Sequence, residues 1–588
     1  PPNQNYQVLV QTGGARAWQN DAVDPGYLER WLLQDRRLTL VEQLPLANMG
    51  DAGTLGDFLS WGVANFPAEH YGLVLWDHGG GAVKGLVYDQ LFAYDCLSLA
   101  ELTTGLSRAG EVFELIGLDA CMMATLETAA ALTPYARYLV ASQEYEPAHG
   151  WDYGVWPALL ETAENGLAVG RGICDSYYDK CVAQGNGAMA TLSVVDLSLI
   201  PPLVSAFQAM AAEMTGVTGD IDLRREFTQG AARTENYGGN NDQEGYANMV
   251  DLGDLTVNTV SVLTHTADRL LERLFDAVKY EVHGKSRSMA NGLSVYYPLD
   301  ISAGDLFSYA DVAVSSRYVG FLGQLTNKPV PEWVDREAPT GEALREEDYA
   351  VVLDTLINSE GYYELRVSEG LESVASVQFR LYYVDGDYQE YVLLGYDNDL
   401  DSAYGEEGVF LDNFRGVWPT LNGCYCAPQL IAEEKGYNLY AVPILLNGAE
   451  MFLRAAWIWD RDGEGHYEVY GAWSGVDDLT GLSARDIRQP RQGDRVELLF
   501  QAEDWETGKT TAYSLGGFTV QDGLVLAESS LADGDYLYQF VVTDVFGRDY
   551  VSQPVRMTVA DDRISLYETG DAYGGQPARP GAKPENPW

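Results

Sequence analysis

The sequence predicts an α/β domain with a mostly parallel sheet flanked by helices, followed by an all-β region of one or two sandwich-like modules. In the first half of the chain, short apolar runs alternate with amphipathic stretches of helical spacing. That order is typical of parallel strands joined by helical crossovers. In the second half, alternating aromatic-rich runs are separated by turn sequences such as DGD, NG and GEG, which is typical of antiparallel strands.

Local signals place the first elements. The first helix begins at Asp51, a good N-cap, and ends at Pro67, which cannot continue a helix. The run 71–76 is apolar throughout, as expected of a central strand covered on both faces. Ser98 and Glu101 form a capping-box pattern that starts the next helix. The predicted strands are 6–11, 71–76, 113–118, 136–141, 189–195 and 292–297, and the predicted helices are 52–66, 99–106, 123–132, 165–184, 203–214 and 257–281.

Changes in composition and residue pattern along the chain predict the domain boundaries. We expect the α/β domain to span residues 1–327 and a Pro-containing, charged linker to span 328–348. Residues 349–562 then form the all-β region. Residues 563–588 are rich in Gly and Pro with little apolar content, which predicts a disordered tail.

Composition excludes several classes of function. The chain of 588 residues carries 87 acidic and 37 basic side chains, a net charge of −50, which argues against binding to nucleic acid or to an anionic membrane. No apolar run is long enough to span a bilayer, so we expect no membrane span. Six cysteines are too few for a disulfide scaffold. An acidic, aromatic-rich chain of this kind suits an extracellular or cell-envelope setting.

Two apolar strands end in residues that can perform thiol chemistry. The run YGLVLW is followed by Asp77 and His78, and the run FELIGL is followed by Asp119, Ala120 and Cys121. Because function collects at the carboxyl ends of parallel strands, the imidazole and the thiol are expected to meet there. Histidine can then activate a thiolate nucleophile.

The glycines at 79–81 offer backbone N–H groups for an oxyanion hole, with Gly79 and Cys121 as the predicted donors. Each residue also has a simpler reading. A cysteine after an apolar strand is often only a small buried side chain, and a histidine before glycines can cap a turn.

The sequence resembles the clostripain family of bacterial cysteine endopeptidases, whose fold is caspase-like. The segments that carry the resemblance are YGLVLWDHGGG at 71–81 and IGLDACMMATLETA at 116–129, supported by 48–72, 141–153, 190–198 and 291–298. The resemblance covers roughly 1–325. It implies a Cys121–His78 dyad that cleaves peptide bonds. It departs from the family at 6–18, where an acidic, Asn-rich turn is usual.

Clostripain-like enzymes usually cut after Arg or Lys, which requires an acidic specificity pocket. Asp119 lies two residues before Cys121, and residues at this spacing in a strand share a face. Asp119 is therefore the first candidate to bind the basic side chain, with Asp152 second and Trp151 as a wall of the pocket. The simpler reading of Asp119 is a local cap.

The resemblance also implies maturation by self-cleavage between His78 and Cys121. Lys84, in a Gly-rich stretch, is the processing candidate, and the alternative is an ordinary exposed lysine. His149 follows the third strand and is a further candidate to contact substrate.

Asp397, Asp399 and Asp401 alternate like half of a calcium loop, although Ser402 stands where an EF-hand has glycine. A solvated acidic turn is the alternative. No cofactor is otherwise required, and calcium is the one candidate.

The sequence thus predicts a secreted or surface-associated bacterial cysteine endopeptidase that cuts proteins or peptides after Arg or Lys. Its β region is expected to position the enzyme or to bind protein or glycan at the cell surface. The alternative is a catalytically inactive caspase-like scaffold that acts as a surface adhesion or binding protein through its β modules.

Overall fold

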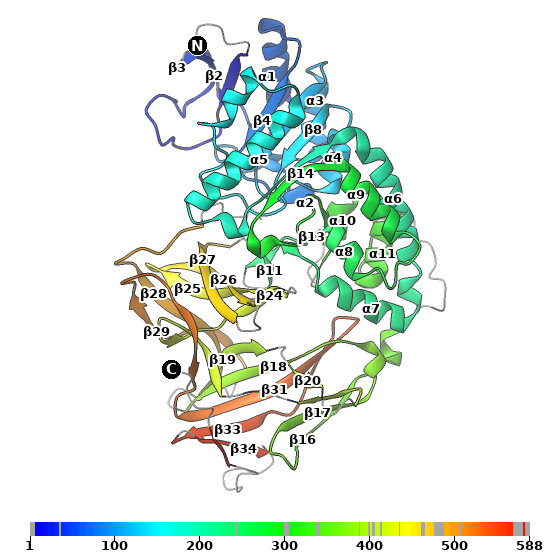
Figure 1. Ribbon diagram of the computed structural model, residues 1–588, viewed down its shortest axis with the longest axis vertical. Coiled ribbons are helices and arrows are strands. Elements are labelled where there is room, and N and C mark those ends of the chain that lie inside the picture. The colour runs from blue at the N-terminus through cyan, green and yellow to red at the C-terminus, as the bar shows by residue number, and fades with distance from the viewer. Residues whose placement is uncertain are drawn as a thin grey trace.

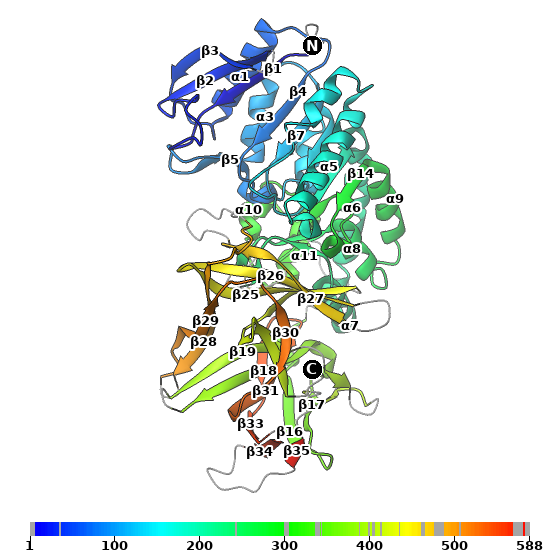
Figure 2. The same cartoon turned by 60° about the vertical axis from the view of Figure 1, so that its left-hand side comes forward.

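The computed structural model shows an α/β domain and an antiparallel β-module that follow one another along the long axis of the molecule (Figure 1). We use α/β domain for residues 6–334 and β-module for residues 344–582. A 60° turn shows strands β25, β26 and β27 of the β-module lying next to the α/β domain (Figure 2). The structure describes residues 6–34, 37–241, 244–298, 305–334, 342, 344–386, 389–397, 400–402, 406–411, 414, 416–433, 436–459, 465–475, 487–504, 507–561, 563–568 and 580–582.

A five-stranded sheet forms the centre of the α/β domain, in the order β14-β9-β8-β7-β4. Its strands are β4 (Gly72–Trp76), β7 (Phe113–Asp119), β8 (Ala136–Ala141), β9 (Thr191–Asp196) and β14 (Val278–His283). The pairs β4–β7 and β7–β8 are parallel, as predicted, whereas β8–β9 and β9–β14 are antiparallel. The sheet is therefore mixed rather than mostly parallel in its pairings.

The antiparallel turn at β9 has a visible cause. Helix α5 (Gly166–Ala183) begins beside the start of β7, where the Gly166 N–H donates to Glu114 Oε1 at 3.0 Å. The segment between β8 and α5 has already brought the chain back to the end of the sheet where β7 begins. Helix α5 then runs to the end of the sheet where β8 finishes. Strand β9 starts from that end, so it runs antiparallel to β8.

Helices cover both faces of the sheet. One face packs through Leu73, Ile116 and Leu139, and the other through Leu115 and Val140, which follows the alternation of side chains along a strand. Helix α5 covers the second face. The remaining helices are α1 (Ala52–Asn65), α2 (Gly81–Lys84), α3 (Leu99–Ser107), α4 (Leu126–Leu132), α6 (Ile200–Met214), α7 (Ile221–Ala232), α8 (Leu252–Asn258), α9 (Ala267–Ala277), α10 (Leu306–Ala310) and α11 (Ser316–Leu325).

Small sheets surround the central one. The strand predicted at 6–11 is β1, and it lies partly exposed in a separate antiparallel sheet β1-β2-β3. A second small sheet, β10-β13-β15, takes up the strand predicted at 292–297. The strands of these sheets are β1 (Val8–Thr12), β2 (Tyr27–Gln34), β3 (Arg37–Pro45), β5 (Leu86–Asp89), β6 (Asp95–Leu97), β10 (Asn236–Tyr237), β11 (Asn240–Asn241), β12 (Gly245–Tyr246), β13 (Met249–Asp251) and β15 (Ser294–Tyr296).

The long helix predicted over 257–281 is wrong. Helix α8 ends at Asn258, α9 begins at Ala267, and the residues from Val278 form strand β14. The β-branched Val278 and Val282 pair with β9 and lie at the edge of the central sheet. Pairing with that edge outweighs the helical spacing that α9 begins.

One stretch of this domain, Leu197–Gly219, is long and apolar enough to span a membrane by length and composition alone. It contains α6, whose Leu203, Phe207 and Met210 are fully buried in the core of the domain. Burial of this apolar face explains the composition of the helix.

The β-module is an all-antiparallel structure with one hydrophobic core, which confirms the predicted all-β region. That core joins a large sheet to two smaller ones. The strands are β16 (Val352–Ile357), β17 (Tyr363–Glu369), β18 (Val374–Asp385), β19 (Glu390–Asp397), β20 (Asp401–Ser402), β21 (Val409–Leu411), β22 (Val417–Leu421), β23 (Cys424–Tyr425), β24 (Gln429–Glu433), β25 (Tyr437–Leu446), β26 (Ala449–Trp459), β27 (Gly465–Trp473), β28 (Arg495–Asp504), β29 (Thr510–Thr519), β30 (Leu526–Ser530), β31 (Gly534–Asp544), β32 (Asp549–Val551), β33 (Val555–Ala560), β34 (Arg563–Glu568) and β35 (Pro580–Ala582).

The predicted disordered tail starts too early. Residues 563–568 form β34, which pairs with β33 along its whole length. Leu566 is buried in the core of the module, so this short alternating segment gains enough apolar contact to be ordered.

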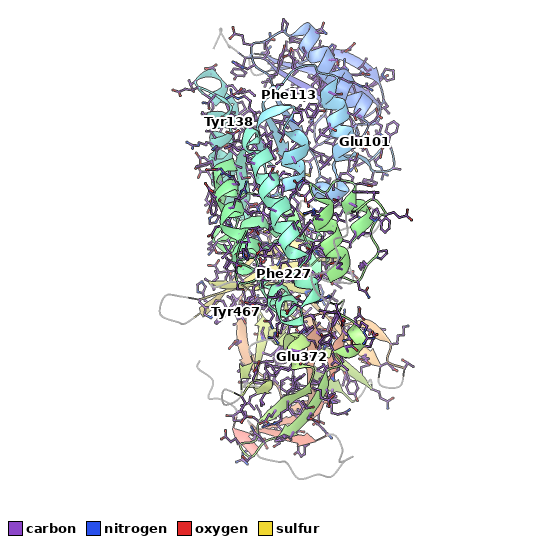
Figure 3. All side chains as sticks on the ribbon, turned by 90° about the vertical axis from the view of Figure 1, so that its right-hand side faces the viewer. Glu101, Phe113, Tyr138, Phe227, Glu372 and Tyr467 are labelled. Atoms are coloured by element: carbon purple, nitrogen blue, oxygen red, sulfur yellow. The ribbon has the colours of Figure 1, made fainter. Side chains whose placement is uncertain are left out.

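Side chains fill the junction between the two bodies, where Figure 3 labels Phe227 on the α/β side and Tyr467 on the module side. Arg224 of α7 anchors one end of the junction. Its guanidinium donates to the carbonyl of Val545 at 3.2 Å and lies 4.5 Å from the ring centroid of Phe546. The β-module is therefore packed onto the domain rather than tethered beside it.

Candidate active site

His78 and Cys121 leave the sheet at adjacent strand ends. Strands β4 and β7 pair in parallel up to Trp76 opposite Asp119. One residue further, the Asp77 N–H donates to the carbonyl of Asp119 at 3.3 Å, so the two chains still run side by side as they leave the strands. His78 is partly exposed and Cys121 is fully buried.

The backbones at Gly79 and Cys121 are in direct contact. A Cβ built on Gly79 would lie 3.0 Å from the Cys121 nitrogen and 2.3 Å from its carbonyl oxygen. Only a residue without a side chain allows this approach. The two N–H groups predicted as oxyanion donors thus belong to neighbouring residues in space.

Cys121 lies in a tight turn just beyond β7, because the chain reverses at Met122, which has a φ of 58°. The Cys121 Sγ lies 3.3 Å from the backbone nitrogen of Glu146, which donates to it, and 3.8 Å from the Glu146 carbonyl. An N–H aimed at sulfur favours negative charge there. Because Cys121 is in the turn, the strand argument that placed it on the same face as Asp119 does not apply.

Asp119 and Cys121 nevertheless contact the same loop, the segment 142–153 that follows β8. Asp119 Oδ2 accepts from the Trp151 N–H at 3.1 Å and from the Tyr153 hydroxyl at 2.9 Å. Its carboxylate is buried. The loop therefore connects the candidate nucleophile to the candidate specificity acid.

The other candidate pocket residues lie in this loop. Asp152 is partly exposed and accepts from the Gly154 N–H at 2.9 Å, which is a local turn contact. Trp151, expected as a pocket wall, is fully buried against the central sheet, and its Nε1 donates to Glu146 at 3.1 Å. Its ring fixes the loop from below rather than lining an open pocket.

His149 has a structural environment of its own. Its Nδ1 lies 2.9 Å from the Gly150 carbonyl and its Nε2 lies 4.0 Å from Cys181 Sγ. Burial raises the pKa of the Cys181 thiol to about 12, so this cysteine stays protonated at neutral pH.

Several polar residues that hold the loop were not singled out in the sequence. Lys180 of α5 donates to the carbonyls of residues 149, 150 and 151 at 2.7, 3.2 and 3.0 Å. Gln143 donates to the buried Asp251 at 2.9 Å and accepts from the Gly292 N–H at 2.9 Å. A lysine within a helix and a glutamine after a strand carry no sequence signal for these roles.

A buried ion triad holds the same loop from behind. Arg287 pairs with Glu144 and, at 2.6 Å, with Glu235. Burial alone would lower the pKa of Arg287, but the Glu144 and Glu235 carboxylates raise it above its ordinary value. Arg287 therefore stays charged, and its pairs fix the position of Glu144, two residues before Glu146.

Lys84 is the exposed last residue of the short helix α2, not part of an irregular loop. Its carbonyl accepts from the Tyr88 hydroxyl at 2.6 Å and from Cys96 Sγ at 3.2 Å. The bond after Lys84 is thus held in place by two hydrogen bonds. The calcium prediction at Asp397, Asp399 and Asp401 lies outside the described residues, because Asp399 and the side chains of the other two are not described.

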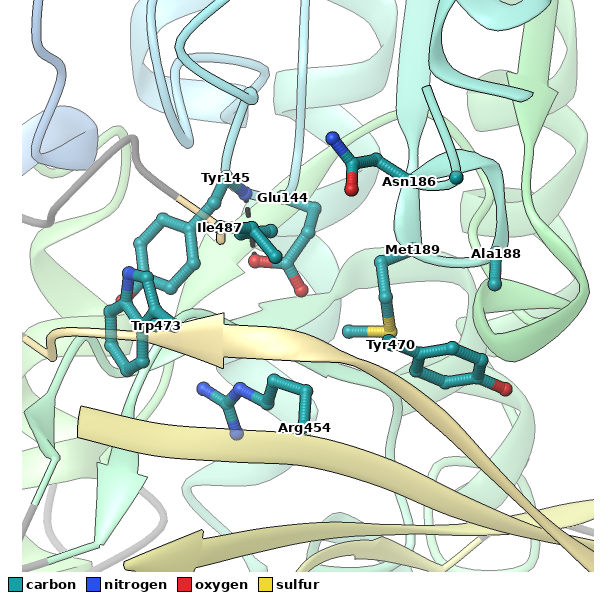
Figure 4. Close-up of a pocket in the computed structure, with 10 residues that line it drawn as sticks. Glu144, Tyr145, Asn186, Ala188, Met189, Arg454, Tyr470, Trp473 and Ile487 are labelled. Atoms are coloured by element: carbon teal, nitrogen blue, oxygen red, sulfur yellow. Dashed lines mark hydrogen bonds between the residues drawn. The ribbon is translucent and has the colours of Figure 1, made fainter. Parts of the chain in front are cut away.

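The β-module closes over this site. Trp473, at the end of β27, packs with Cys121, Met122 and Tyr145 in one buried cluster, and its ring centroid lies 4.7 Å from that of Tyr145. Figure 4 shows Trp473 beside Tyr145, with Arg454 and Glu144 lining the same cavity. No sequence pattern linked these residues to the site.

Comparison with known proteins places this site in a family. The model of the clostripain family matches residues 27–315, which include both strand ends. Clostripain from Hathewaya histolytica is 31% identical over 125 residues, which cover 18% of this chain and 24% of clostripain. The matched stretch thus spans about a quarter of that protein's own length.

Two solved structures are similar at lower identity. A secreted C11 cysteine protease from Bacteroides thetaiotaomicron in complex with an irreversible peptide inhibitor is 22% identical, with a TM-score of 0.37, and the match covers 47% of this chain and 80% of that one. An inactive zymogen C11 protease from Parabacteroides distasonis is 21% identical, with a TM-score of 0.38, over 49% of this chain and 83% of that one.

The family match holds the His-Gly-Gly-Gly and Asp-Ala-Cys segments whose backbones meet in the structure. Residues 27–315, just under half of this chain, match the clostripain family.

Proposed function

We propose that the chain is a cysteine endopeptidase that uses a Cys121–His78 dyad and cuts after Arg or Lys. The observation that supports it best is the contact of Gly79 with Cys121 at the ends of two parallel strands, directly after His78. This juxtaposition is what a thiol nucleophile and its base require. We further propose that the α/β domain is caspase-like and that the protein works outside the cell or in the cell envelope.

The reaction runs through an acyl-enzyme. His78 takes the proton from the Cys121 thiol, and the sulfur attacks the carbonyl carbon of the scissile bond. The Gly79 and Cys121 N–H groups stabilise the oxyanion that forms. The protonated imidazole then gives its proton to the leaving amine, and water releases the acyl group from the sulfur.

Acidic residues select the substrate in this proposal. Asp119 and Asp152 receive the basic side chain on the acyl side of the cut, with Trp151 supporting the loop beneath them. A net charge of −50 also raises the local concentration of cationic peptides. Lys84 remains the proposed site of self-processing, and calcium the proposed ion.

Peptides that end in Arg, Lys or Leu before a fluorogenic leaving group test the proposal. In the opened variant described below, we expect release after Arg and Lys, little after Leu, and none once Cys121→Ala or His78→Ala is added. Cys424→Ala, a half-buried thiol in the β-module, should keep the parent rate. Each assay is run with calcium and with a chelator.

Intact mass after incubation detects a cut at Lys84. Absence of turnover, both in the parent and in the opened variant described below, would favour an inactive scaffold.

A further inference from the structure

The candidate nucleophile has no exposed surface. Cys121 is 0% exposed, although the neighbouring His78 is partly exposed. The residues that enclose Cys121 come from both bodies of the molecule: Met122 and Tyr145 from the α/β domain, and Trp473 from the β-module. Ala247 and Phe452 complete the cluster at its edge. A peptide bond cannot reach a sulfur enclosed in this way.

Arg454 of β26 enters the same region and meets an acid of the α/β domain. Its Nη1 lies 3.0 Å from Glu244 Oε1, and the two side chains are 5% and 0% exposed. The guanidinium carbon lies 4.8 Å from the Trp473 ring centroid, so Arg454 and Trp473 form one unit. A cation beside a carboxylate offsets much of the cost of burying its charge.

Glu244 lies in the hairpin of β11 and β12, which contacts the loop beside Cys121. At the base of that hairpin, the Gly239 N–H donates to the Tyr145 hydroxyl at 2.7 Å, and the Gly238 N–H donates to Glu144 at 3.2 Å. Tyr145 is the ring that packs between Cys121 and Trp473. The hairpin that carries Glu244 is therefore bonded directly to the loop beside the candidate nucleophile.

Polar bonds fasten the β-module around the covered site. Tyr437 donates to the buried Glu235 at 2.5 Å, and Asn236 donates to the Ile431 carbonyl at 2.9 Å. Ser286 bonds Tyr470. A small cavity lies at this contact, lined by Met189, Tyr470 and Arg454.

We propose that the β-module is a built-in pseudosubstrate: Trp473 covers Cys121, and Arg454 takes the place of a basic substrate side chain at Glu244. The intact chain is then held closed, and it turns over substrate only when the β-module moves or is cut away. Once Arg454 leaves, Glu244 becomes an acidic subsite. Because Asp119 serves the residue at the cut, Glu244 selects a second basic residue of the substrate.

Alkylation of Cys121 in the full chain tests the cover without requiring peptidase activity. Iodoacetamide is attacked by the thiolate, a carbon–sulfur bond forms, and iodide leaves. Peptide mass spectrometry then gives the labelling rate of each cysteine. We expect Cys121 to label at least tenfold faster in the opened variant, Arg454→Ala with Trp473→Ala, than in the parent. Equal rates would overturn the proposal.

Internal controls separate opening from unfolding. Arg380→Ala and Trp457→Ala remove an arginine that stacks on Tyr396 and a tryptophan that packs on Tyr467, both within the β-module, and should keep the parent rate. Cys174, buried in α5, reports unfolding and should stay unlabelled. If Cys174 labels faster in the opened variant, that variant is partly unfolded, and the single variant Arg454→Gln, which keeps Trp473, is used in its place. A Cys121 labelling rate in Arg454→Gln equal to that of the parent would count against the proposal.

Peptides with one or two basic residues test Glu244. This part rests on the proposed function. In the opened variant, we expect peptides ending in Arg-Arg to have a severalfold lower KM than those ending in Ala-Arg. Glu244→Gln should abolish that difference with kcat little changed. Faster alkylation without turnover would contradict the peptidase function but support the cover. Equal turnover in the parent and in the opened variant would support the peptidase function and contradict the cover.

Discussion

At the scale of single residues, Asp119 shows how much chemistry a motif predicts. Its position two residues before Cys121 pointed to a specificity acid, and its carboxylate does reach the loop that contacts the Cys121 sulfur. The route is different, because Cys121 lies in a turn and not in the strand. A motif identifies residue types, whereas the direction of each side chain depends on the turn at Met122.

Asp119→Asn removes the charge and keeps the shape. We expect the preference for Arg over Leu in kcat/KM to fall about 10- to 100-fold, since a charge-assisted hydrogen bond contributes roughly 1.5–3 kcal/mol. Rates are compared in the opened variant, with Asp152→Asn as the matched substitution. An unchanged preference in Asp119→Asn would assign selection to another acid.

Residues that support the candidate site only through tertiary contacts could not be predicted from the sequence. Lys180 holds three consecutive carbonyls of the loop from a helix, and Glu144 is fixed by Arg287, far along the chain. Neither has a motif. Their positions depend on the packing of α5 and of the segment before β15, which no local pattern encodes.

At the scale of elements, the strand ends were predictable and the sheet edge was not. Continuous apolar runs predicted β7 and β8 correctly as buried strands. The run at 71–76 also forms a strand, β4, but β4 is an edge strand of the sheet and only partly buried, not the covered central strand that the sequence predicted. Strand β14 was hidden in a helical pattern, because its pairing with β9 overrides the local preference. The turn that closes the site depends on the glycine after His78.

Gly79→Ala tests that close contact between the two strand ends. The added Cβ would lie 2.3 Å from the Cys121 carbonyl oxygen, so the turns must separate. In the opened variant, we expect activity to fall at least 100-fold and the melting temperature to drop. Gly72→Ala, at the start of the strand that leads to Gly79, is the control, because its Cβ would meet only the Leu115 carbonyl at 3.8 Å. Equal effects of the two substitutions would show that the contact is not special.

At the scale of the whole molecule, the order of the two bodies was predictable but their contact was not. Composition separated the α/β domain from the β-module, since alternating aromatic runs differ from helical spacing. The packing of Trp473 on Tyr145 joins residues from opposite halves of the chain. Such a contact leaves no periodic signal in either segment.

Global stability is expected to depend on pH through Glu127 of α4. Burial raises its pKa to about 7, against 4.5 for the unfolded chain. Between these values the folded state keeps the proton and the unfolded state loses it, so this contribution falls as pH rises toward 7. The loss is about 3 kcal/mol.

Glu127→Gln removes this contribution. We expect its melting temperature to fall less than that of the parent between pH 5 and 7.5, as measured by thermal unfolding. Asp254, whose pKa burial also raises to about 7, is present in both proteins, so the difference isolates Glu127. Parallel curves for the two proteins would refute the assignment.

The hydroxyl of Tyr437 has a consequence for protein engineering. It donates to Glu235, which pairs with Arg287, which in turn holds Glu144 in the loop beside Cys121. If the α/β domain is fused to a foreign C-terminal partner, the Glu235 carboxylate loses the hydrogen bond that Tyr437 donates. Chimeras should therefore carry a replacement hydroxyl beside Glu235 if the segment 142–153 is to keep its shape.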